Sequence, residues 1–403
     1  MKKLFSILLV ATLCFSCFSF VGCTDRSEQL KIYAPGEYID EEIFDDFEEW
    51  YFEQTGKEVE IILSTFDTVE QIMTTVERDH ADYDLLLPSD YAVEQLLNKD
   101  LLQKIERVEV EDILVDEYVE LARVSDPTLE YSVPYMYGTF GLMYDYSKIN
   151  EHIDSWDAIF TNAYSGYSAN KDSLREAITS AAIWANKATL SNLSNGFTDY
   201  NAQYKAKLQQ LFEDVSDNAL NKAINALSQA KQYNAIWGGE DLKFNMAAGA
   251  SNIKVALMWS CDAGYIMNDY EDEDGELHSG NKNLWYVVPK EGSNVYIDSF
   301  VISKYAENVE AAQYFLEYVC KQEVAITNSK YAGAISPVRA AYNELWYEIT
   351  GQLDLNVDLD EDWKNMYIDT FFPSTETLAR CGTMRDYGEN DAKVSLAWNN
   401  VKY

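Results

Sequence analysis

The segment Val287–Ile302, VVPKEGSNVYIDSFVI, contains two apolar runs on either side of a polar turn. Pro289 ends the first run because proline cannot donate to a strand ladder, and Glu291–Asn294 is a cluster of turn-forming residues. The second run, Val295–Ile302, contains a single carboxylate, Asp298. A carboxylate among apolar side chains is costly to bury unless a cation meets it. Asp298 therefore either faces water at a loop or sheet edge, or meets a cation.

Earlier in the chain, short apolar runs alternate with helical patterns. Three predicted strands share this short apolar composition: Gln29–Tyr33, Glu58–Leu63 and Tyr83–Leu87. In the helix predicted over Asp40–Thr55, apolar residues recur on one face, and Gly56 is a natural stop. Alternating strands and helices indicate an open parallel α/β sheet, whose ligands bind beyond the carboxyl ends of the strands. The loops Ala34–Tyr38 and Pro88–Tyr91 are at such ends.

A second block of helices and strands follows the first. Its predicted elements are Thr139–Tyr144, Asp154–Phe160, Asp172–Asn186 with Asp172 as its N-cap, Tyr200–Asp214, Asn218–Gln232 and Lys254–Trp259. The chain then returns to the first block through Val287–Ile302. Re-entry into a first lobe after a second α/β block predicts an α/β protein with two lobes.

Six motifs occur in the order found in the spermidine/putrescine-binding proteins of bacterial ABC transporters, which the chain resembles from about Leu30 to its C-terminus. They are the loop Tyr33–Tyr38, LLLPSDY, VPYMYG, DSLRE, ALMW and PKEGSNVYIDS. The resemblance implies a type II periplasmic-binding-protein fold with a ligand cleft between the lobes. Lobe 1 would comprise 29–137 plus about 298–340, and lobe 2 would comprise 138–297 plus about 341–403. Segments near Tyr137-Gly138, Asp298-Ser299 and Gly333–Pro337 would form the hinge.

The resemblance also implies a role for each residue that matches a ligand contact of the family. Tyr38 would stack on the ligand chain beside the loop acid Glu37, Ser89 and Tyr91 would form a strand-end pair, Glu176 and Asp298 would bind amines, and Trp259 and Tyr296 would form facing aromatic walls. Aromatic faces and carboxylates suit a chain of ammonium groups and methylenes. Taken singly, Trp259 could be a core residue, Tyr296 a filler of the sheet, and Glu176 a favourable charge at a helix start.

Departures from the family pattern leave the length of the ligand open. Pro35 and Tyr296 stand where tryptophan is usual, and Ser173 stands where some members have a second acid. Asp298 and Glu176 suffice for the two charges of putrescine, whereas spermidine has a third. Glu37 could supply the carboxylate for that third amine, which favours spermidine slightly.

Other functional classes fit the sequence less well. The three histidines are scattered and no nucleophile loop occurs, which speaks against ester or peptide hydrolysis, although a hydrolase that uses two carboxylates stays an alternative. Binding of another cation such as thiamine or iron is a further alternative. We expect a binding protein with no enzymatic activity, cofactor or resident metal.

Composition restricts the partners. The formal net charge of −37 argues against binding to nucleic acid or to an anionic membrane surface, and it favours solubility or attraction of cations. Cys261, Cys320 and Cys381 are an odd set without C-x-x-C spacing, so buried thiols are favoured and one disulfide stays an alternative. We expect a monomer that docks onto the permease subunits of an ABC transporter.

The amino terminus predicts export and lipidation. Lys2 and Lys3 precede the apolar run Leu4–Val21, which is typical of a signal peptide over 1–22, although an uncleaved anchor is an alternative. Phe20–Cys23 resembles the bacterial lipobox. By that resemblance Cys23 is lipidated and begins a tether over 23–28, so the protein is held at the outer side of the cell membrane or in the periplasm.

The lipidation of Cys23 is testable by metabolic labelling. A fatty-acid probe should label the wild-type protein and fail to label Cys23→Ala, because the predicted lipid is attached at Cys23. An unlabelled wild-type protein released into the medium would contradict the prediction.

Overall fold

The computed structural model describes residues 25–402, except residues 67, 240, 250–251, 272–275 and 357–358. The predicted signal peptide (1–22) and Cys23 lie outside the described residues. Of the predicted tether, Arg26–Glu28 forms a single 3-10 turn, and Arg26 Nη2 lies 2.9 Å from Asp84 Oδ2. Among the described residues, no helix combines the length and apolar character needed to cross a membrane.

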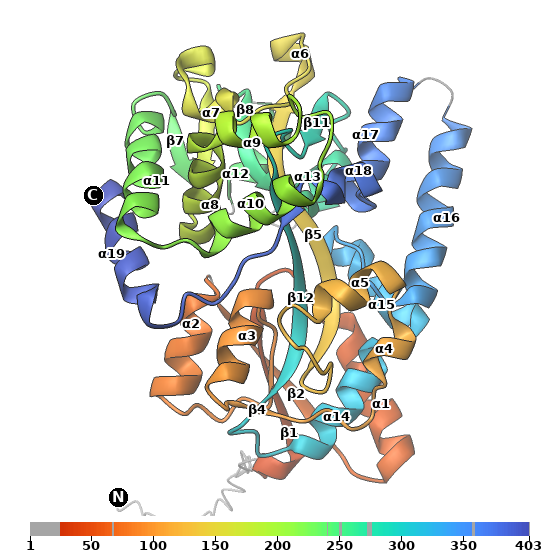
Figure 1. Cartoon of the computed structure of the whole chain (residues 1–403). Coiled ribbons are helices and arrows are strands. Elements are labelled where there is room, and N and C mark those ends of the chain that lie inside the picture. The colour runs from red at the N-terminus through yellow and green to blue at the C-terminus, as the bar shows by residue number, and fades with distance from the viewer. Residues whose placement is uncertain are drawn as a thin grey trace, which may run out of the picture.

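Two long antiparallel strands, β5 (Ser132–Asp145) and β12 (Ser293–Ser303), run through the whole molecule from the lower to the upper lobe (Figure 1). Every residue of both strands is buried. The strand β11 (Leu284–Val287) precedes β12, and the turn between them includes Gly292 at a φ of 111°. The strand–turn–strand prediction for Val287–Ile302 is therefore confirmed.

The lower lobe is built on the parallel strands β2 (Glu60–Phe66), β1 (Gln29–Pro35) and β3 (Leu85–Leu86), in that order, followed by β12. Helix α1 (Glu42–Thr55) covers this sheet because its apolar residues recur on one face, and it ends at Gly56, whose φ is 71°. The connections also include α2 (Glu70–Met73) and α3 (Asp90–Asn98). The strand and helix predictions for this half are confirmed within a few residues.

The upper lobe repeats the arrangement with β8 (Val255–Trp259), β6 (Ser168–Lys171) and β7 (Ile236–Gly238), which are parallel to one another. The strand β5 joins this sheet antiparallel to β8, and β12 joins the lower sheet antiparallel to β3. The sheet is therefore mixed in each lobe, because the parallel strands are joined by a crossing strand that runs antiparallel to its neighbour. The parallel sheet predicted for the first block is confirmed for β1, β2 and β3, and the predicted return of the chain through Val287–Ile302 is confirmed by β12.

The helix predicted to start from an Asp172 N-cap begins two residues later. Helix α8 (Leu174–Ala185) has Ser173 at its N-cap position. Asp172 instead forms an ion pair with Lys402, with 2.8 Å between Oδ2 and Nζ. The prediction of Asp172 as the N-cap is wrong, because a lysine from the far end of the chain attracts its carboxylate.

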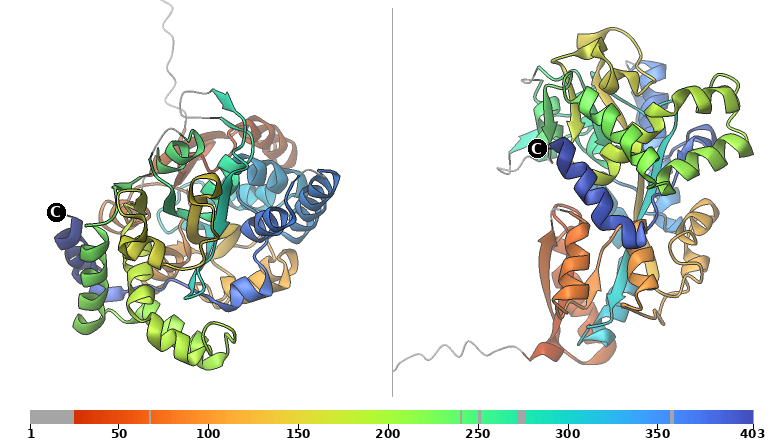
Figure 2. Two further views of the ribbon diagram at one scale, coloured as in Figure 1. Left: turned by 90° about the horizontal axis from the view of Figure 1, so that it is seen from above. Right: turned by 60° about the vertical axis from the view of Figure 1, so that its left-hand side comes forward.

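The remaining elements connect and cover these sheets. They are α4 (Val110–Ile113), α5 (Asp116–Ala122), α6 (Tyr146–Ile149), α7 (Asp157–Phe160), α9 (Lys187–Leu193), α10 (Ala202–Glu213), α11 (Asp217–Ala230), α12 (Asp241–Ala247), α13 (Ser260–Met267), α14 (Val309–Val319), α15 (Gln322–Ala332), α16 (Arg339–Leu355), α17 (Glu361–Phe371), α18 (Thr375–Ala379), α19 (Asp391–Lys402), β4 (Leu102–Gln103), β9 (Tyr270–Glu271), β10 (Leu277–His278) and β13 (Cys381–Gly382). Figure 2 shows α19 lying along the upper lobe, where it packs against α8 and α11.

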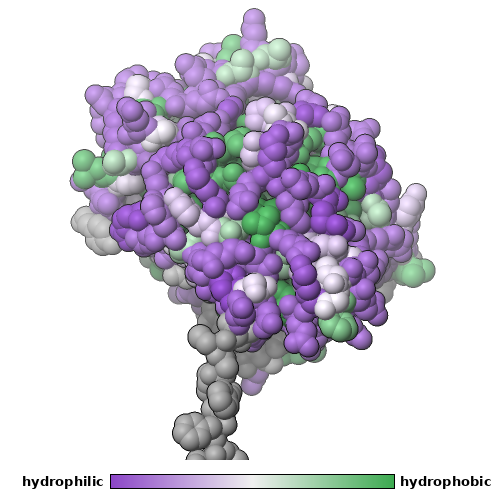
Figure 3. Space-filling model, turned by 90° about the horizontal axis from the view of Figure 1, so that it is seen from below, coloured by the Kyte–Doolittle hydropathy of each residue, from purple (hydrophilic) through white to green (hydrophobic). Residues whose placement is uncertain are grey.

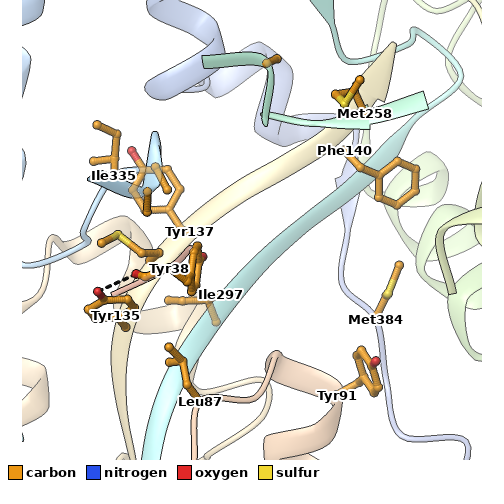
Figure 4. Close-up of a cluster of buried hydrophobic side chains, with 14 of the residues drawn as sticks. Tyr38, Leu87, Tyr91, Tyr135, Tyr137, Phe140, Met258, Ile297, Ile335 and Met384 are labelled. Carbon is orange, nitrogen blue, oxygen red and sulfur yellow. Dashed lines mark hydrogen bonds between the residues drawn. The ribbon is translucent and has the colours of Figure 1, made fainter. Parts of the chain in front are cut away.

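Three chain segments lie side by side where the lobes meet. Tyr137 pairs with Ile297 across β5 and β12, and its N–H donates to the carbonyl of Ile335 at 3.1 Å. The register of β12 shifts between Asp298 and Ser299, which is a bulge in the strand. Figure 4 shows Tyr137 and Ile335 together on one side of the paired strands, with Tyr91 and Met384 on the other side. The segments predicted to connect the lobes are therefore neighbours in space.

The face of the lower lobe seen from below is mostly hydrophilic, with apolar residues in small groups (Figure 3). This surface agrees with the acidic composition of the chain. The three cysteines outside the first 24 residues, Cys261, Cys320 and Cys381, are partly buried free thiols. The alternative of a disulfide among them is therefore not found.

Gly138 in β5 provides a test of the packing between the lobes. A Cβ at this position would overlap the hydroxyl group of Tyr296 and lie 2.7 Å from Ser260 Oγ. Gly138→Ala should therefore lower the free energy of unfolding by roughly 1–3 kcal/mol, measured by urea denaturation. Gly36→Ala is the control, since a Cβ there meets nothing within 4 Å. Equal stabilities of the two variants would contradict the close packing at Gly138.

Candidate ligand-binding site

The carboxyl ends of strands from both lobes point toward the region between the lobes. In the lower lobe, β1 leads into the loop that carries Glu37 and Tyr38, and β3 is followed by Ser89. In the upper lobe, β8 ends at Trp259, and β6 leads into helix α8, which carries Glu176. Asp298 lies at the bulge of β12, a strand that both lobes share. The topology therefore places predicted ligand contacts of both lobes at one level of the molecule.

Asp298 is a buried carboxylate with neutral hydrogen-bond donors. Only 9% of the residue is exposed. The hydroxyl group of Tyr38 donates to Oδ2 at 2.7 Å, and Ser89 lies beside Asp298 as its partner in an isolated antiparallel bridge. Among the described residues, Oδ1 has no hydrogen-bond partner. Burial, with a smaller contribution from the nearby carboxylate of Glu176, raises the pKa of Asp298 to about 6 despite the hydrogen bonding.

Glu176 is the second carboxylate of the site. Its Oε1 accepts a hydrogen bond from the indole Nε1 of Trp259 at 3.2 Å, and its Oε2 accepts one from the hydroxyl group of Ser173. Burial raises the pKa of Glu176 above its usual range. The two carboxylates therefore share one property: neutral groups solvate them, and each has a raised pKa. Such groups are candidates for binding a cation.

Tyr38 and Tyr296 lie in the same buried region. Tyr38 is 9% exposed and Tyr296 is 8% exposed. The backbone carbonyl of Tyr38 accepts a hydrogen bond from the hydroxyl group of Tyr135 at 2.9 Å (Figure 4), which positions the loop after β1. The hydroxyl group of Tyr296 donates to Cys261 Sγ at 3.4 Å. Burial raises the pKa of both tyrosines well above the usual value, so both are neutral hydrogen-bond donors near Asp298.

A cluster of opposite charges lies beside Trp259. Lys171 Nζ is 3.8 Å from the centroid of the Trp259 ring and 3.1 Å from Asp262 Oδ2. Lys243 Nζ is 3.3 Å from Asp262 Oδ1 and 3.5 Å from Glu37 Oε2. Burial raises the pKa of Asp262, but the two ammonium groups outweigh burial and hold the pKa below its usual range. Glu37 of the lower lobe thus contacts a lysine of the upper lobe.

Tyr91 faces a different part of the region between the lobes. Its ring lies 4.0 Å from the guanidinium carbon of Arg175, and the ring of Tyr387 lies 3.9 Å from the same carbon. The hydroxyl group of Tyr91 is 3.4 Å from Glu70 Oε1. Tyr91, Glu70 and Arg175 help to line a cavity of about 400 Å³ between α2, α3, α8 and α19. The ring of Tyr91 therefore already contacts a cation of the protein itself.

Sequence reasoning gave no role to Lys171, Arg175, Lys243 or Asp262. Weak signals for three of them were present in the motifs themselves. Arg175 precedes Glu176 in DSLRE, Lys171 directly precedes that motif, and Asp262 follows ALMW by three residues. Their proximity depends on the parallel pairing of β6 with β7 and β8, which a local pattern does not reveal.

Two lobes joined by crossing strands, with buried carboxylates and aromatic side chains between them, define a two-lobed solute-binding protein. A family model described as "Bacterial extracellular solute-binding protein" matches residues 42–353. The chain belongs to this family, whose members bind solutes for transport and are not a family of enzymes.

Individual relatives are similar at low identity over most of their length. The chain is 25% identical over 337 residues to the putrescine-binding periplasmic protein SpuD of Pseudomonas aeruginosa, covering 80% of this chain and 82% of that protein. It is 22% identical over 349 residues to the spermidine/putrescine-binding periplasmic protein of Escherichia coli, covering 85% and 88% of the two chains. The structure of the spermidine/putrescine substrate-binding protein PotD of Streptococcus pneumoniae has a TM-score of 0.65 at 24% identity, covering 93% of this chain and 98% of that chain. This structural similarity shows the two-lobed fold.

Asp298→Asn should stabilise the ligand-free protein. The pKa of Asp298 rises from 3.8 to about 6 on folding, which at about 1.4 kcal/mol per unit corresponds to roughly 3 kcal/mol. Between these pH values the folded state binds more protons than the unfolded state, so this residue reduces stability progressively from about pH 4 to about pH 6. The gain from Asp298→Asn should therefore be largest above about pH 6 and vanish near pH 4 in urea denaturation.

Asp84→Asn is the matched control for this experiment. Asp84 is also fully buried, but its carboxylate forms an ion pair with Arg26 at 2.9 Å. Removing one partner of a buried ion pair is destabilising, so this variant should lose stability at neutral pH. A loss of stability in Asp298→Asn as well would show that Asp298 is not an uncompensated charge.

Proposed function

We propose that this protein binds a polyamine, putrescine or spermidine, in the region between its lobes and delivers it to the permease of an ABC transporter. The observation that carries the proposal is the pair of the buried Asp298 and the partly buried Glu176, two carboxylates with raised pKa values and neutral donors. An ammonium group beside each carboxylate would form charge-assisted hydrogen bonds and remove the cost of burying the negative charge.

The aromatic residues suit the rest of such a ligand. The rings of Tyr38, Tyr296 and Trp259 offer apolar contact to methylenes and a negative ring face to ammonium groups. Ser89 would orient Asp298, while Glu37 and Tyr91 would line the outer parts of the site. Because Asp298, Tyr38 and Tyr296 are almost fully buried, we propose that the lobes separate to admit the ligand and close around it.

Similarity to relatives supports the same class of ligand, since SpuD is named for putrescine and the relative from Escherichia coli for spermidine and putrescine. We further propose that the mature protein is a monomer held at the cell envelope by a lipid on Cys23. Thiamine and iron are weaker candidates. Among the described residues, no three His, Cys, Asp or Glu side chains are arranged to hold a metal ion.

Calorimetric titration with putrescine and spermidine tests the proposal. Wild type should bind at least one of them, and Asp298→Asn should weaken that binding by roughly 2–5 kcal/mol because an ammonium group loses its buried partner. Glu176→Gln should weaken it in the same direction. A thermal-shift panel that also contains spermine, thiamine and sugars shows whether the protein binds a ligand of another class instead.

Glu291→Gln is the control for loss of a buried carboxylate. Glu291 is buried, has a pKa raised by burial, and accepts hydrogen bonds from the Ser155 hydroxyl and the Trp156 backbone N–H, in the turn before β12. Its substitution should leave polyamine affinity unchanged. Wild-type protein that responds to thiamine or sugars and to no polyamine would overturn the proposed function.

A further inference from the structure

Two aromatic side chains expected to face the ligand are already in contact with cations of the protein. Lys171 Nζ lies 3.8 Å from the ring centroid of Trp259, and the guanidinium carbon of Arg175 lies 4.0 Å from that of Tyr91. An ammonium group of a ligand would seek the same kind of position over an aromatic ring. These two cations therefore stand beside two of the aromatic residues expected to line the site, Trp259 and Tyr91.

Lys171 is firmly held in its position. Its side chain is 3% exposed, and it extends from the carboxyl end of β6 to the Asp262 carboxylate. Lys243 contacts the other oxygen of Asp262 and also the carboxylate of Glu37. The two ammonium groups of this cluster thus face two carboxylates, Asp262 and Glu37. Each of these two carboxylates already has a cationic partner among the described residues, so a further amine would have to compete with Lys171 or Lys243 for it.

Arg175 is held in the same way beside Tyr91. Its guanidinium group lies between the rings of Tyr91 and Tyr387, and Nη2 is 3.1 Å from Asp391 Oδ1. Nη1 also donates to the backbone carbonyl of Arg385 at 2.8 Å, which ties helix α8 to the segment before α19. With 5% of its side chain exposed, Arg175 is as fixed as Lys171.

We propose that Lys171 and Arg175 restrict the ligand to two ammonium groups, so that the protein selects a diamine such as putrescine over triamines and tetraamines. The inference rests on the proposed function and narrows it to one class of polyamine. Asp298 and Glu176 meet the two ammonium groups of a diamine. A third ammonium group would come close to Lys171 or Arg175 in a poorly solvated region, where like charges repel strongly and an unpaired charge is costly to bury.

This assignment gives Glu37 a different role from that of a contact to a third amine. Its carboxylate contacts Lys243 across the two lobes and thereby helps to balance the lysine cluster. Glu37 would then favour the closed arrangement of the lobes for any bound diamine, without measuring ligand length. The preference for spermidine suggested by Glu37 alone is replaced by a preference for putrescine.

Lys171→Met tests the proposal because it removes the charge and keeps an apolar side chain against Trp259. In calorimetric titrations, wild type should bind putrescine at least about tenfold more tightly than spermidine, and Lys171→Met should reduce this ratio by about tenfold or more. The matched control is Lys254→Met. Lys254 also lies over an aromatic ring, that of Tyr167 at 4.6 Å, but it precedes β8 and so lies at the opposite end of that strand from Trp259. The control should keep the wild-type ratio.

A second measurement requires no variant and so does not depend on the folding of Lys171→Met. In N-butylputrescine, a methyl group replaces one terminal ammonium group of spermidine, so length is kept and the third charge is removed. Wild type should bind this compound about tenfold more tightly than spermidine if charge limits the ligand.

The outcomes separate the two proposals. Wild-type protein that binds spermidine as tightly as putrescine, or a folded Lys171→Met with the wild-type ratio, would overturn the diamine inference and leave polyamine binding intact. Equal rejection of N-butylputrescine and spermidine would show that length, and not charge, sets the limit, which also overturns it. Failure of wild type to bind any polyamine would instead overturn the proposed function.

Discussion

The burial of Asp298 on a strand shared by both lobes is the constraint on which the site depends. Its carboxylate lies where β12 bulges, with the hydroxyl group of Tyr38 as a donor, Ser89 beside it, and no cation among its described contacts. Hydroxyl groups solvate a buried carboxylate incompletely, so the pKa of Asp298 rises and its negative charge destabilises the ligand-free protein. A binding protein can tolerate this cost, because a cationic ligand offsets it when the lobes close.

The same region contains a second arrangement of charge with the opposite character. Asp262, between Lys171 and Lys243, has its negative charge fully balanced, and its pKa is lowered. Trp259 lies at the boundary between the two arrangements, since its indole N–H contacts Glu176 and its ring contacts Lys171. Trp259 thus lies between Glu176, whose described contacts include no cation, and Asp262, which contacts Lys171 and Lys243. This difference in charge surroundings can select a ligand by the number of its positive charges as well as by the sign of its charge.

Local patterns predicted much of the fold because they depend on neighbours in the chain. The apolar face of α1 and its glycine stop, the strands β1, β2, β3 and β8, and the strand–turn–strand of Val287–Ile302 follow from residue spacing and turn chemistry. Predictions failed where a distant partner intervened. Asp172 does not cap α8 because Lys402 pairs with it, and the short strands β6 and β7 were not predicted because their pairing with each other and with β8 is not visible in a local pattern.

The sequence by itself determined that Asp298 is anomalous, that strand ends carry tyrosines and acids, and that the chain has two α/β blocks. Only the tertiary structure decided which of these side chains have partners within the protein. Lys171 reaches Trp259 and Asp262 because β6 lies beside β8 and both strands end at the same edge of the upper sheet. Charge balance in a buried region is a sum over residues that are distant in the chain, and the pairing of strands is what brings them within a few ångströms of one another.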